Sequence, residues 1–166
     1  IFKMPDEKPL NENYLLVCLE SINDPGNLGT IIRTCEWFGI KDIVCSLDSV
    51  DCYNPKVVQS AMGSLSRINI TYLDLSKFLK SKSLKKFGTF IAGESVYENK
   101  ISVAKGIVVF GNEANGISDD LRVLLDVKLT IPRFNHDSYP ESLNLSNSVG
   151  IVLSEFSRKF NEKKSL

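Results

Sequence analysis

The sequence predicts an α/β fold in a single domain. Continuous apolar runs of the kind found in strands covered on both faces of a parallel sheet occur at Leu15–Leu19, Ile43–Cys45, Phe90–Ala92 and Ile107–Phe110. Segments with apolar residues at helical spacing lie between these runs. Strands that alternate with helices in this way indicate a parallel sheet with helices on both of its faces.

Three apolar stripes place the main helices. The first runs from Leu28 through Ile31 to Phe38, and it follows the first strand. The second runs from Leu75 to Leu84, before the strand predicted at Phe90–Ala92. The third runs from Leu145 to Phe160 and ends the predicted fold. A short helix is also expected to start at Ser118, because Asp119 and Asp120 follow in its first turn.

The composition supports one domain and gives little sign of a partner. The chain has 166 residues, 43% of them hydrophobic, which is enough for one core but not for a second domain. The formal net charge is zero, so the basic surface expected of a free-standing nucleic-acid binder is missing. We expect residues 14–166 to form the domain and residues 1–13 to be a linker or the remnant of an upstream region, which could hold an RNA-binding domain.

Metal sites, membrane segments and secretion are not predicted. The cysteines form no C-x-x-C pair and the only histidine is His136, so zinc-ligand spacing is absent from the sequence. His136 lies in a polar loop without a nucleophile nearby, and we interpret it as an ordinary loop histidine. Cys18, Cys35 and Cys45 sit in apolar contexts and are expected to be reduced and buried, which favours the cytoplasm. No apolar run approaches a membrane span, and the first residues are too polar for a secretory signal.

Asn23–Gly39 is the first of three segments that carry more than packing residues. A Pro-Gly turn leads from the first strand into a helix, whose N-terminus is a natural place for an anion. Gly26 and Gly29 do not complete the G-x-G-x-x-G pattern, which disfavours a dinucleotide-binding enzyme. Arg33 lies off the apolar stripe and can reach back toward the loop, although taken alone an arginine there is more often a solvated residue than a catalytic one. Asn27 is open to a simpler interpretation as a helix N-cap.

Ile107–Leu121 is the second segment, again a strand followed by a loop and a helix. Gly111 and Gly116 let backbone approach a ligand closely, but turn chemistry alone explains them about as well. Glu113 lies between them at the carboxyl end of a buried strand. A carboxylate is costly there unless it meets a partner or a ligand, so Glu113 is a candidate site residue.

Leu129–Phe156 is the third segment. A strand is expected to end at Ile131 and Pro132, and a polar loop then leads to a helix that begins near Ser142. A serine before an apolar helix is typical of an N-cap, which is the simplest interpretation of Ser142. Ser146, Gly150 and Ser154 recur every fourth residue on that helix. They indicate either a close approach of a second helix or only a polar face.

Together these segments resemble the three motifs of the SpoU family, in the SPOUT superfamily of methyltransferases. The resemblance runs from Tyr14 to Phe156 and is to the C-terminal catalytic domain of tRNA and rRNA ribose 2′-O-methyltransferases. The matching residues are Asn23, Asn27, Gly29 and Arg33, then Gly111, Glu113 and Gly116, then Ile131, Pro132 and the run Ser142–Ser146. One departure is the loop Arg133–Glu141, which is longer than in the family and lacks its glycine.

The resemblance implies a fold, a cofactor and a reaction. The fold would be a parallel sheet of about six strands whose C-terminal part is tied in a deep trefoil knot, a feature otherwise nearly absent from proteins. The cofactor would be S-adenosyl-L-methionine, released as S-adenosyl-L-homocysteine, with no metal. Its methyl group would pass to a ribose 2′-hydroxyl of RNA, ribosomal RNA being preferred over transfer RNA. The alternative is a non-catalytic RNA-binding or assembly module that keeps the fold.

The resemblance also implies the roles of individual residues. In the family a homodimer is part of the mechanism, because the active site takes the arginine of the first motif, here Arg33, from the other subunit. An arginine suits oxyanion stabilisation or phosphate anchoring better than a base role. The remaining catalytic candidates, which would orient the target nucleotide, are Asn27, Glu113, Ser142 and Asn144. The expected cofactor contacts are Phe110, Gly111, Asn112, Gly116, Ile131, Pro132, Ser142, Leu143, Asn144 and Leu145.

Overall fold

The fold is built on one parallel sheet of six strands. The computed structural model describes residues 9–98, 105–135 and 142–164. Its strands lie in the order β3-β2-β1-β5-β4-β6, and every pair is parallel. The strands are β1 (Leu15–Leu19), β2 (Asp42–Ser46), β3 (Asn69–Leu73), β4 (Lys86–Ser95), β5 (Gly106–Phe110) and β6 (Val127–Thr130). The predicted α/β class is confirmed.

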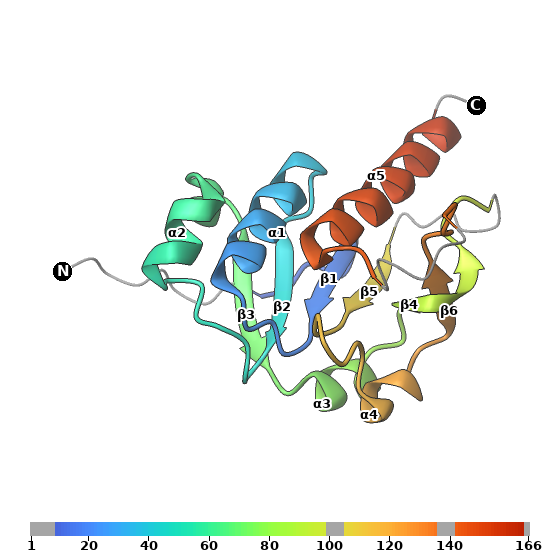
Figure 1. The fold of residues 1–166 in the computed structure, drawn as a ribbon, viewed down its shortest axis with the longest axis horizontal. Coiled ribbons are helices and arrows are strands. Elements are labelled where there is room, and N and C mark those ends of the chain that lie inside the picture. Colours follow the sequence, from blue (N-terminus) through green and yellow to red (C-terminus); the bar gives the residue numbers. More distant parts are fainter. Residues whose placement is uncertain (1–8, 99–104, 136–141, 165–166) are drawn as a thin grey trace.

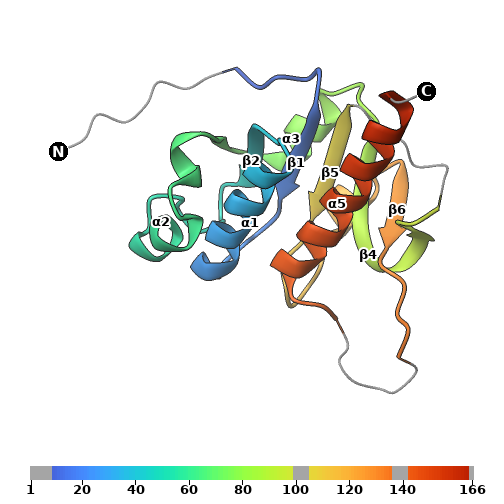
Figure 2. The same ribbon diagram turned by 90° about the horizontal axis from the view of Figure 1, so that it is seen from above.

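Helices cover both faces of the sheet, as predicted. Three helices lie on one face, and Figures 1 and 2 show two of them, α1 and α5, side by side. The two short helices α3 and α4 lie on the other face. The bounds are α1 (Pro25–Trp37), α2 (Pro55–Ala61), α3 (Leu75–Lys80), α4 (Asp119–Arg122) and α5 (Leu145–Lys164), with one 3₁₀ turn at Ser64–Ser66.

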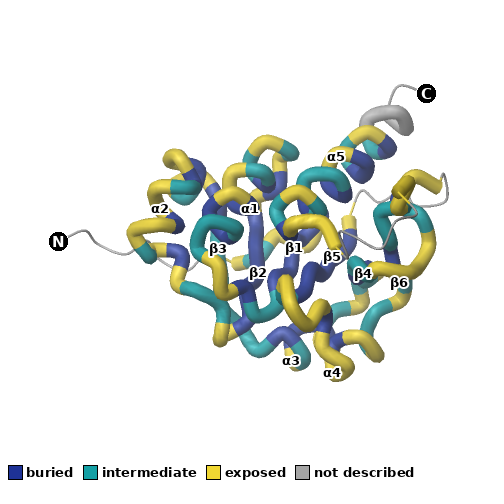
Figure 3. Tube along the Cα trace, in the orientation of Figure 1, coloured by how far each residue is buried: buried dark blue, intermediate teal, exposed yellow. Residues whose placement is uncertain are grey.

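The inner strands owe their continuous apolar sequences to burial on both faces. All residues of β1, β2 and β5 are buried (Figure 3). Along β1, Leu15, Val17 and Leu19 point into the core under α1 and α5, and the residues between them point into the core under α3 and α4. Alternate side chains of a strand face opposite sides of the sheet, so a strand covered on both faces is mostly apolar; the polar ends of β2, Asp42 and Ser46, are buried with hydrogen-bond partners.

The prediction that Phe90–Ala92 is a strand buried on both faces is wrong. These residues lie within β4, but the register against β6 shifts between Thr89 and Glu94, both of which pair with Leu129. The residues between them bulge out of the ladder, and Ile91 is 82% exposed. Gly93 lies close to β6, since a Cβ there would be 2.4 Å from the carbonyl oxygen of Lys128. Phe90 still packs against the core, whereas Ile91 and Ala92 are exposed.

Other predictions hold in part. The helix predicted from the second apolar stripe is shorter than the stripe. It ends at Lys80, and Leu84 packs against the core from the segment after the helix. Neither α2 nor β3 was predicted. The linker prediction for residues 1–13 remains a prediction, because residues 1–8 lie outside the described part of the chain. The same is true of the knot, because residues 136–141 are also outside it.

The cysteine prediction is confirmed. Cys18, Cys35, Cys45 and Cys52 are all free and buried. Burial disfavours a charged thiolate, and it raises the pKa of Cys45 to about 12 and the pKa values of Cys18 and Cys35 still further. These thiols are therefore unreactive core residues. Among the described residues, no helix is both long and apolar enough to cross a bilayer.

The buried carboxylate of Glu155 gives the stability of the fold a defined pH dependence. It accepts hydrogen bonds from Arg158 at 2.6 and 2.9 Å and lies 3.3 Å from the ammonium of Lys159. The Arg158 hydrogen bonds in particular hold the pKa of Glu155 below its usual value of 4.5, despite the opposing effect of burial. A lowered pKa in the folded state means that Glu155 stabilises the fold above about pH 4.5 and loses this effect as the pH falls.

We expect Glu155→Gln to remove this contribution. At pH 7 the variant should lose roughly 1.5–3 kcal/mol of unfolding free energy, the size of a hydrogen bond to a charged group. The difference from wild type should shrink as the pH falls below about 4.5. Urea unfolding followed by circular dichroism at a series of pH values measures it. A difference that stays constant with pH would contradict the assignment.

Candidate active site

The main cavity lies at the carboxyl ends of the strands in the C-terminal half of the sheet. It has a volume of ≈ 920 Å³. Five segments line it: the bulge of β4 with the turn after that strand, the loop after β5, the end of α4, the end of β6 with the loop that follows, and the start of α5. In open α/β sheets, ligands bind beyond the carboxyl ends of the strands, so this is the expected place for a ligand site.

Most of the predicted cofactor residues line this cavity. They are Gly111, Asn112, Gly116, Ile131, Pro132, Ser142, Leu143 and Leu145. Phe110 does not line it, because its side chain is wholly buried and its carbonyl oxygen accepts a hydrogen bond of 2.9 Å from the backbone N–H of Glu20. Asn144 does not line it either, and has a different role described below.

Sequence reasoning missed several residues of the cavity wall. Phe90 and Ile91 come from the bulge of β4, which resembles an ordinary strand in the sequence. Tyr97 follows the same strand, Arg122 ends α4, and Phe134 lies after β6. None of these residues belongs to a motif, so no sequence signal separated them from core or surface residues.

A chain of hydrogen bonds joins the three predicted motifs. The side-chain amide of Asn27 donates to Glu113 Oε1 at 2.8 Å, and its Oδ1 accepts from the amide of Asn144 at 3.0 Å. Asn27 lies in α1, Glu113 lies in the loop after β5, and Asn144 directly precedes α5. The chain of hydrogen bonds therefore joins three segments that are far apart in the sequence. The sequence singles out Glu113 because a buried carboxylate would need a partner; its side chain is in fact exposed, and it is bonded to Asn27. The second carboxylate oxygen of Glu113 bonds to no residue within the described ranges.

The structure corrects both N-cap interpretations. The cap of α1 is Asp24, whose Oδ1 accepts from the backbone N–H of Asn27 at 2.7 Å. Asn27 lies inside the helix, so its side chain does not cap the helix and is available to bond to Glu113. Asn144 precedes α5, and its Oδ1 accepts from the backbone N–H of Ser146 at 2.9 Å, as a cap does. Ser142 lies outside the helix with an exposed side chain at the cavity wall.

Turn geometry accounts for both glycines of the second motif. Asn112 and Gly116 form an isolated bridge with reciprocal backbone hydrogen bonds of 3.0 and 2.9 Å. A Cβ on Gly111 would lie 2.1 Å from the carbonyl carbon of Gly116, and Gly116 itself has a φ of +68°. The Asn112 side chain accepts from Ala114 N–H at 2.8 Å and donates to the carbonyl of Ser21 at 2.7 Å. The turn that carries Glu113 is thereby fixed to the loop before α1.

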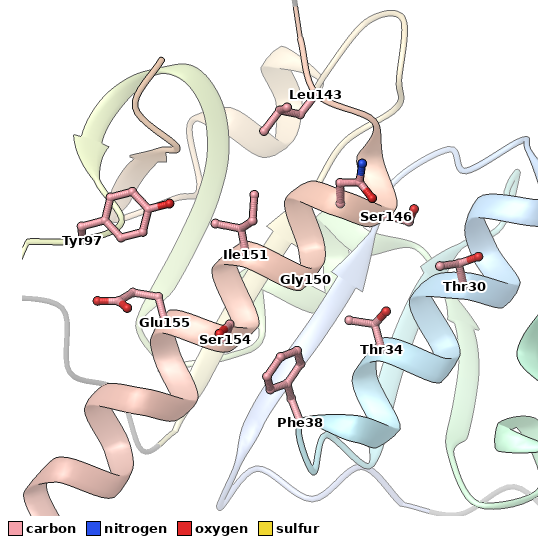
Figure 4. A pocket seen from close by; sticks show the side chains of 11 residues that line it. Thr30, Thr34, Phe38, Tyr97, Leu143, Ser146, Gly150, Ile151, Ser154 and Glu155 are labelled. Carbon is pink, nitrogen blue, oxygen red and sulfur yellow. The ribbon is translucent and has the colours of Figure 1, made fainter. Parts of the chain in front are cut away.

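Arg33 lies outside the cavity of its own chain. Its side chain is exposed and forms no hydrogen bond or ion pair with the residues that the structure describes. The expectation that it reaches back toward the loop before α1 is not met. Close to it, Thr30 and Thr34 of α1 face a groove shared with Gly150 and Ser154 of α5 (Figure 4). Arg33 does not line this groove, but it follows Thr30 by three positions on the same helix, so the two residues are neighbours on the helix surface.

The structure bears on the remaining site predictions only in part. His136 lies outside the described residues, and the long loop Arg133–Glu141 is described only as far as Asn135. Within the described ranges, no group of three or more histidine, cysteine, aspartate or glutamate side chains is placed to hold a metal ion.

Comparison with known proteins links this geometry to a family. The sequence model of the SpoU rRNA Methylase family matches residues 14–154. The chain is 29% identical over 153 residues to the 23S rRNA (guanosine(2553)-2′-O)-methyltransferase RlmP of Bacillus subtilis (strain 168), covering 90% of this chain and 60% of that protein. It is 33% identical over 156 residues to the 23S rRNA (guanosine-2′-O-)-methyltransferase RlmB of Neisseria meningitidis serogroup B, and this match also covers 90% of this chain and 60% of that protein.

Solved structures agree with the sequence relatives. The SpoU methyltransferase AviRb from Streptomyces viridochromogenes, crystallised with the cofactor AdoMet, is 26% identical with a TM-score of 0.84. The match covers 96% of this chain and 67% of AviRb. The chain spans only about 60% of the length of the two sequence relatives named above.

Proposed function

The chain belongs to the SpoU rRNA Methylase family, and from that premise we propose that it transfers a methyl group from S-adenosylmethionine to a ribose 2′-hydroxyl of RNA. The observation that carries the proposal is the hydrogen-bond chain from Glu113 through Asn27 to Asn144 beside the ≈ 920 Å³ cavity. Ribosomal RNA is the preferred substrate, because RlmP and RlmB are named for it. An RNA substrate and buried reduced thiols support a cytoplasmic location.

The cavity fits an adenosyl cofactor. Its volume of ≈ 920 Å³ is within the range of small-molecule sites, about 300–1,000 Å³. Ile131 and Leu143 offer apolar surface for the faces of an adenine ring. The irregular backbone at Gly111 and at Pro132 borders the same space and suits the polar edge of the ring. The bound cofactor would supply a methyl group carried by a cationic sulfonium. The neutral thioether that remains after transfer is a good leaving group and needs no metal.

The polar residues of the site would hold the ribose for attack. A ribose hydroxyl is a poor nucleophile at neutral pH, so it must be positioned and its developing charge stabilised. Glu113 is oriented by Asn27 through Oε1, which leaves Oε2 to accept the hydrogen bond of the 2′-hydroxyl. Asn27 is itself held by Asn144, whose own orientation is set by its cap of α5. Ser142, exposed at the cavity wall, is the further hydroxyl available to the nucleotide.

We further propose that the enzyme is a homodimer in which each site receives Arg33 from the partner subunit. Arg33 is exposed and lies outside the cavity of its own chain. The groove between α1 and α5 includes the small residues Ser146, Gly150 and Ser154 on its α5 side, which allow a second helix to approach closely there. A side chain at Gly150 would reach Thr34 only at 3.9 Å, so the groove has space at that point. The guanidinium of Arg33 from the partner subunit would bring a positive charge to the site. Among the motif residues at the site, the chain that holds the cavity itself supplies only the negative charge of Glu113.

Cofactor binding is the direct test of the proposed site. Leu143 lies on the cavity wall and is 48% exposed, so a tryptophan there should fill the space of the cofactor without disturbing the core. We expect Leu143→Trp to weaken S-adenosylmethionine and S-adenosylhomocysteine binding by tenfold or more, equivalent to about 1.4 kcal/mol, in isothermal titration calorimetry. Leu47→Trp is the control, because Leu47 is 70% exposed and does not line the cavity.

Two results would count against the proposal. Equal binding by the Leu143→Trp and Leu47→Trp variants would move the cofactor out of this cavity. No binding by folded wild-type protein would instead favour the non-catalytic RNA-binding module that keeps the fold.

A further inference from the structure

Two exposed aromatic rings lie on the wall of the cavity. Among the described residues, the exposed aromatic side chains are Tyr14, Trp37, Tyr53, Tyr97 and Phe134. Only Tyr97 and Phe134 of this group line the cavity; they are 44% and 83% exposed. Tyr97 follows β4 and Phe134 follows β6, so separate segments bring the two rings to one site. Exposed aromatic surface that gathers at a cavity indicates a ligand with an apolar face.

The turn that carries Tyr97 is rigid. The backbone N–H of Tyr97 donates to Ser95 Oγ at 3.2 Å, and that of Glu98 donates to the carbonyl of Ser95 at 3.1 Å. Val96 is fully buried, and its N–H donates to the carbonyl of Thr130 on β6 at 2.9 Å. The backbone on both sides of Tyr97 is therefore fixed while its ring remains half exposed.

A buried ammonium group secures the same turn to α5. Lys159 is only 5% exposed, and its Nζ donates to the carbonyl of Val96 at 2.9 Å and to the carbonyl of Glu98. The carboxylate of Glu155 lies 3.3 Å away and supplies the opposite charge. A lysine has three donors, and each has a partner here, as a buried charge requires. Lys159 thus holds the two carbonyl groups that flank Tyr97, whose side chain lies beside Ile151 and Glu155 in Figure 4.

We propose that Tyr97 and Phe134 form a stacking site for a nucleobase of the RNA, and that Lys159 is the positioning residue of Tyr97. The inference deepens the proposed function and rests on it, because the ribose must enter the cavity beside these rings. A chain of zero net charge has no overall electrostatic attraction for RNA, so a further source of affinity would add to the contacts that its individual cations make with phosphates. Base stacking on aromatic rings is such a source, and single-stranded RNA presents its bases for it.

The test measures RNA binding apart from methyl transfer. The probe is a fluorescein-labelled single-stranded oligo(A) RNA of about 12 nucleotides, followed by fluorescence anisotropy. Tyr97→Ala and Phe134→Ala are each expected to raise its Kd about tenfold, and Tyr97→Phe should keep wild-type affinity. The matched control is Tyr53→Ala, because Tyr53 is 42% exposed but lies away from the cavity. Equal affinity of the Tyr97→Ala, Phe134→Ala and Tyr53→Ala variants, or no binding by wild type, would overturn the proposal.

A double-mutant cycle tests the role of Lys159. Lys159→Met should raise the Kd for the oligonucleotide in the wild-type background but not in the Tyr97→Ala background, because its effect passes through the ring. Effects that simply add would show that Lys159 is only structural and would overturn its assignment. If Lys159→Met does not fold, the Tyr97 and Phe134 variants still decide the stacking site.

Two further measurements separate other roles of Tyr97. Tyr97 lines the cavity and also the groove between α1 and α5. Tyr97→Ala should raise the Kd for the oligonucleotide much more than the Kd for S-adenosylmethionine, and it should leave the sedimentation of the protein unchanged. An equal loss of cofactor binding would make Tyr97 part of the cofactor site, and a changed oligomeric state would make it a subunit contact. Either result overturns the proposal. Failure of wild type to bind S-adenosylmethionine would instead contradict the proposed function, while the RNA titrations would still report on stacking.

Discussion

Replacing Arg33 with alanine is expected to lower the rate of methyl transfer by about 100- to 1,000-fold, the usual effect of removing one group that stabilises an oxyanion. The affinity for S-adenosylmethionine should not change, because Arg33 does not line the cavity of its own chain. Arg33 is exposed and unpaired among the described residues, so its loss should also leave the stability of the fold intact. Single-turnover transfer of a labelled methyl group into 23S rRNA measures the rate, and calorimetry measures the affinity.

The control for Arg33→Ala is a second exposed arginine. Arg67 pairs with Glu36 at the surface and lies outside the cavity, so Arg67→Ala should keep the wild-type rate. Arg33→Lys should recover only part of the activity, because an ammonium cannot reproduce the planar fork of donors. A wild-type rate in Arg33→Ala would remove Arg33 from the mechanism.

Mixed subunits show from which chain Arg33 acts. An Arg33→Ala protein and a Glu113→Ala protein should each be inactive alone. In a mixed dimer, one of the two sites combines an intact Glu113 with an intact Arg33 of the partner subunit. Random mixing should therefore restore about a quarter of the wild-type activity, if the dimer is symmetric. No recovery after subunit exchange would mean that Arg33 acts within its own chain.

Much of the fold could be predicted because burial leaves a clear pattern in the sequence. The bounds predicted for β1 match the structure, and those for β5 differ by one residue. Both strands are buried on both faces, so every position is apolar and the run ends where burial ends. Glu113 is also singled out by the sequence, but for a cost of burial that does not arise, because its side chain is exposed and its hydrogen bond to Asn27 is what places it in the site.

The parts that could not be predicted depend on where elements end or which segments meet. Ser142 and Asn144 are both good N-cap residues, and only the actual start of α5 at Leu145 decides between them. In the same way, the apolar run at Phe90–Ala92 reads as a buried strand until its register against β6 is known. Contacts such as that between Lys159 and Val96 join residues far apart in the chain and leave no local signal.

A methyl group added at Gly111 is expected to have the largest effect on stability. In Gly111→Ala the new Cβ would lie 2.1 Å from the backbone of Gly116, at a point where no flexible side chain can give way. The turn must open, and the hydrogen bonds between Asn112 and Gly116 would be strained or lost. We expect the unfolding free energy to fall by about 4 kcal/mol or more, in the range that marks a severe structural conflict. Thermal and urea unfolding followed by circular dichroism measure the change.

Gly150→Ala is the matched control, and within the subunit its effect should have the opposite sign; its sedimentation is measured alongside, because Gly150 lines the groove proposed for the partner's helix. Its new Cβ would meet only the methyl group of Thr34 at 3.9 Å, which is ordinary van der Waals contact. Gly150 lies inside α5, where alanine is favoured over glycine by about 0.5–1 kcal/mol. The same chemical change should therefore stabilise one site slightly and disrupt the other. If Gly111→Ala unfolds at the wild-type urea concentration, the turn that holds Glu113 is not constrained by close backbone packing.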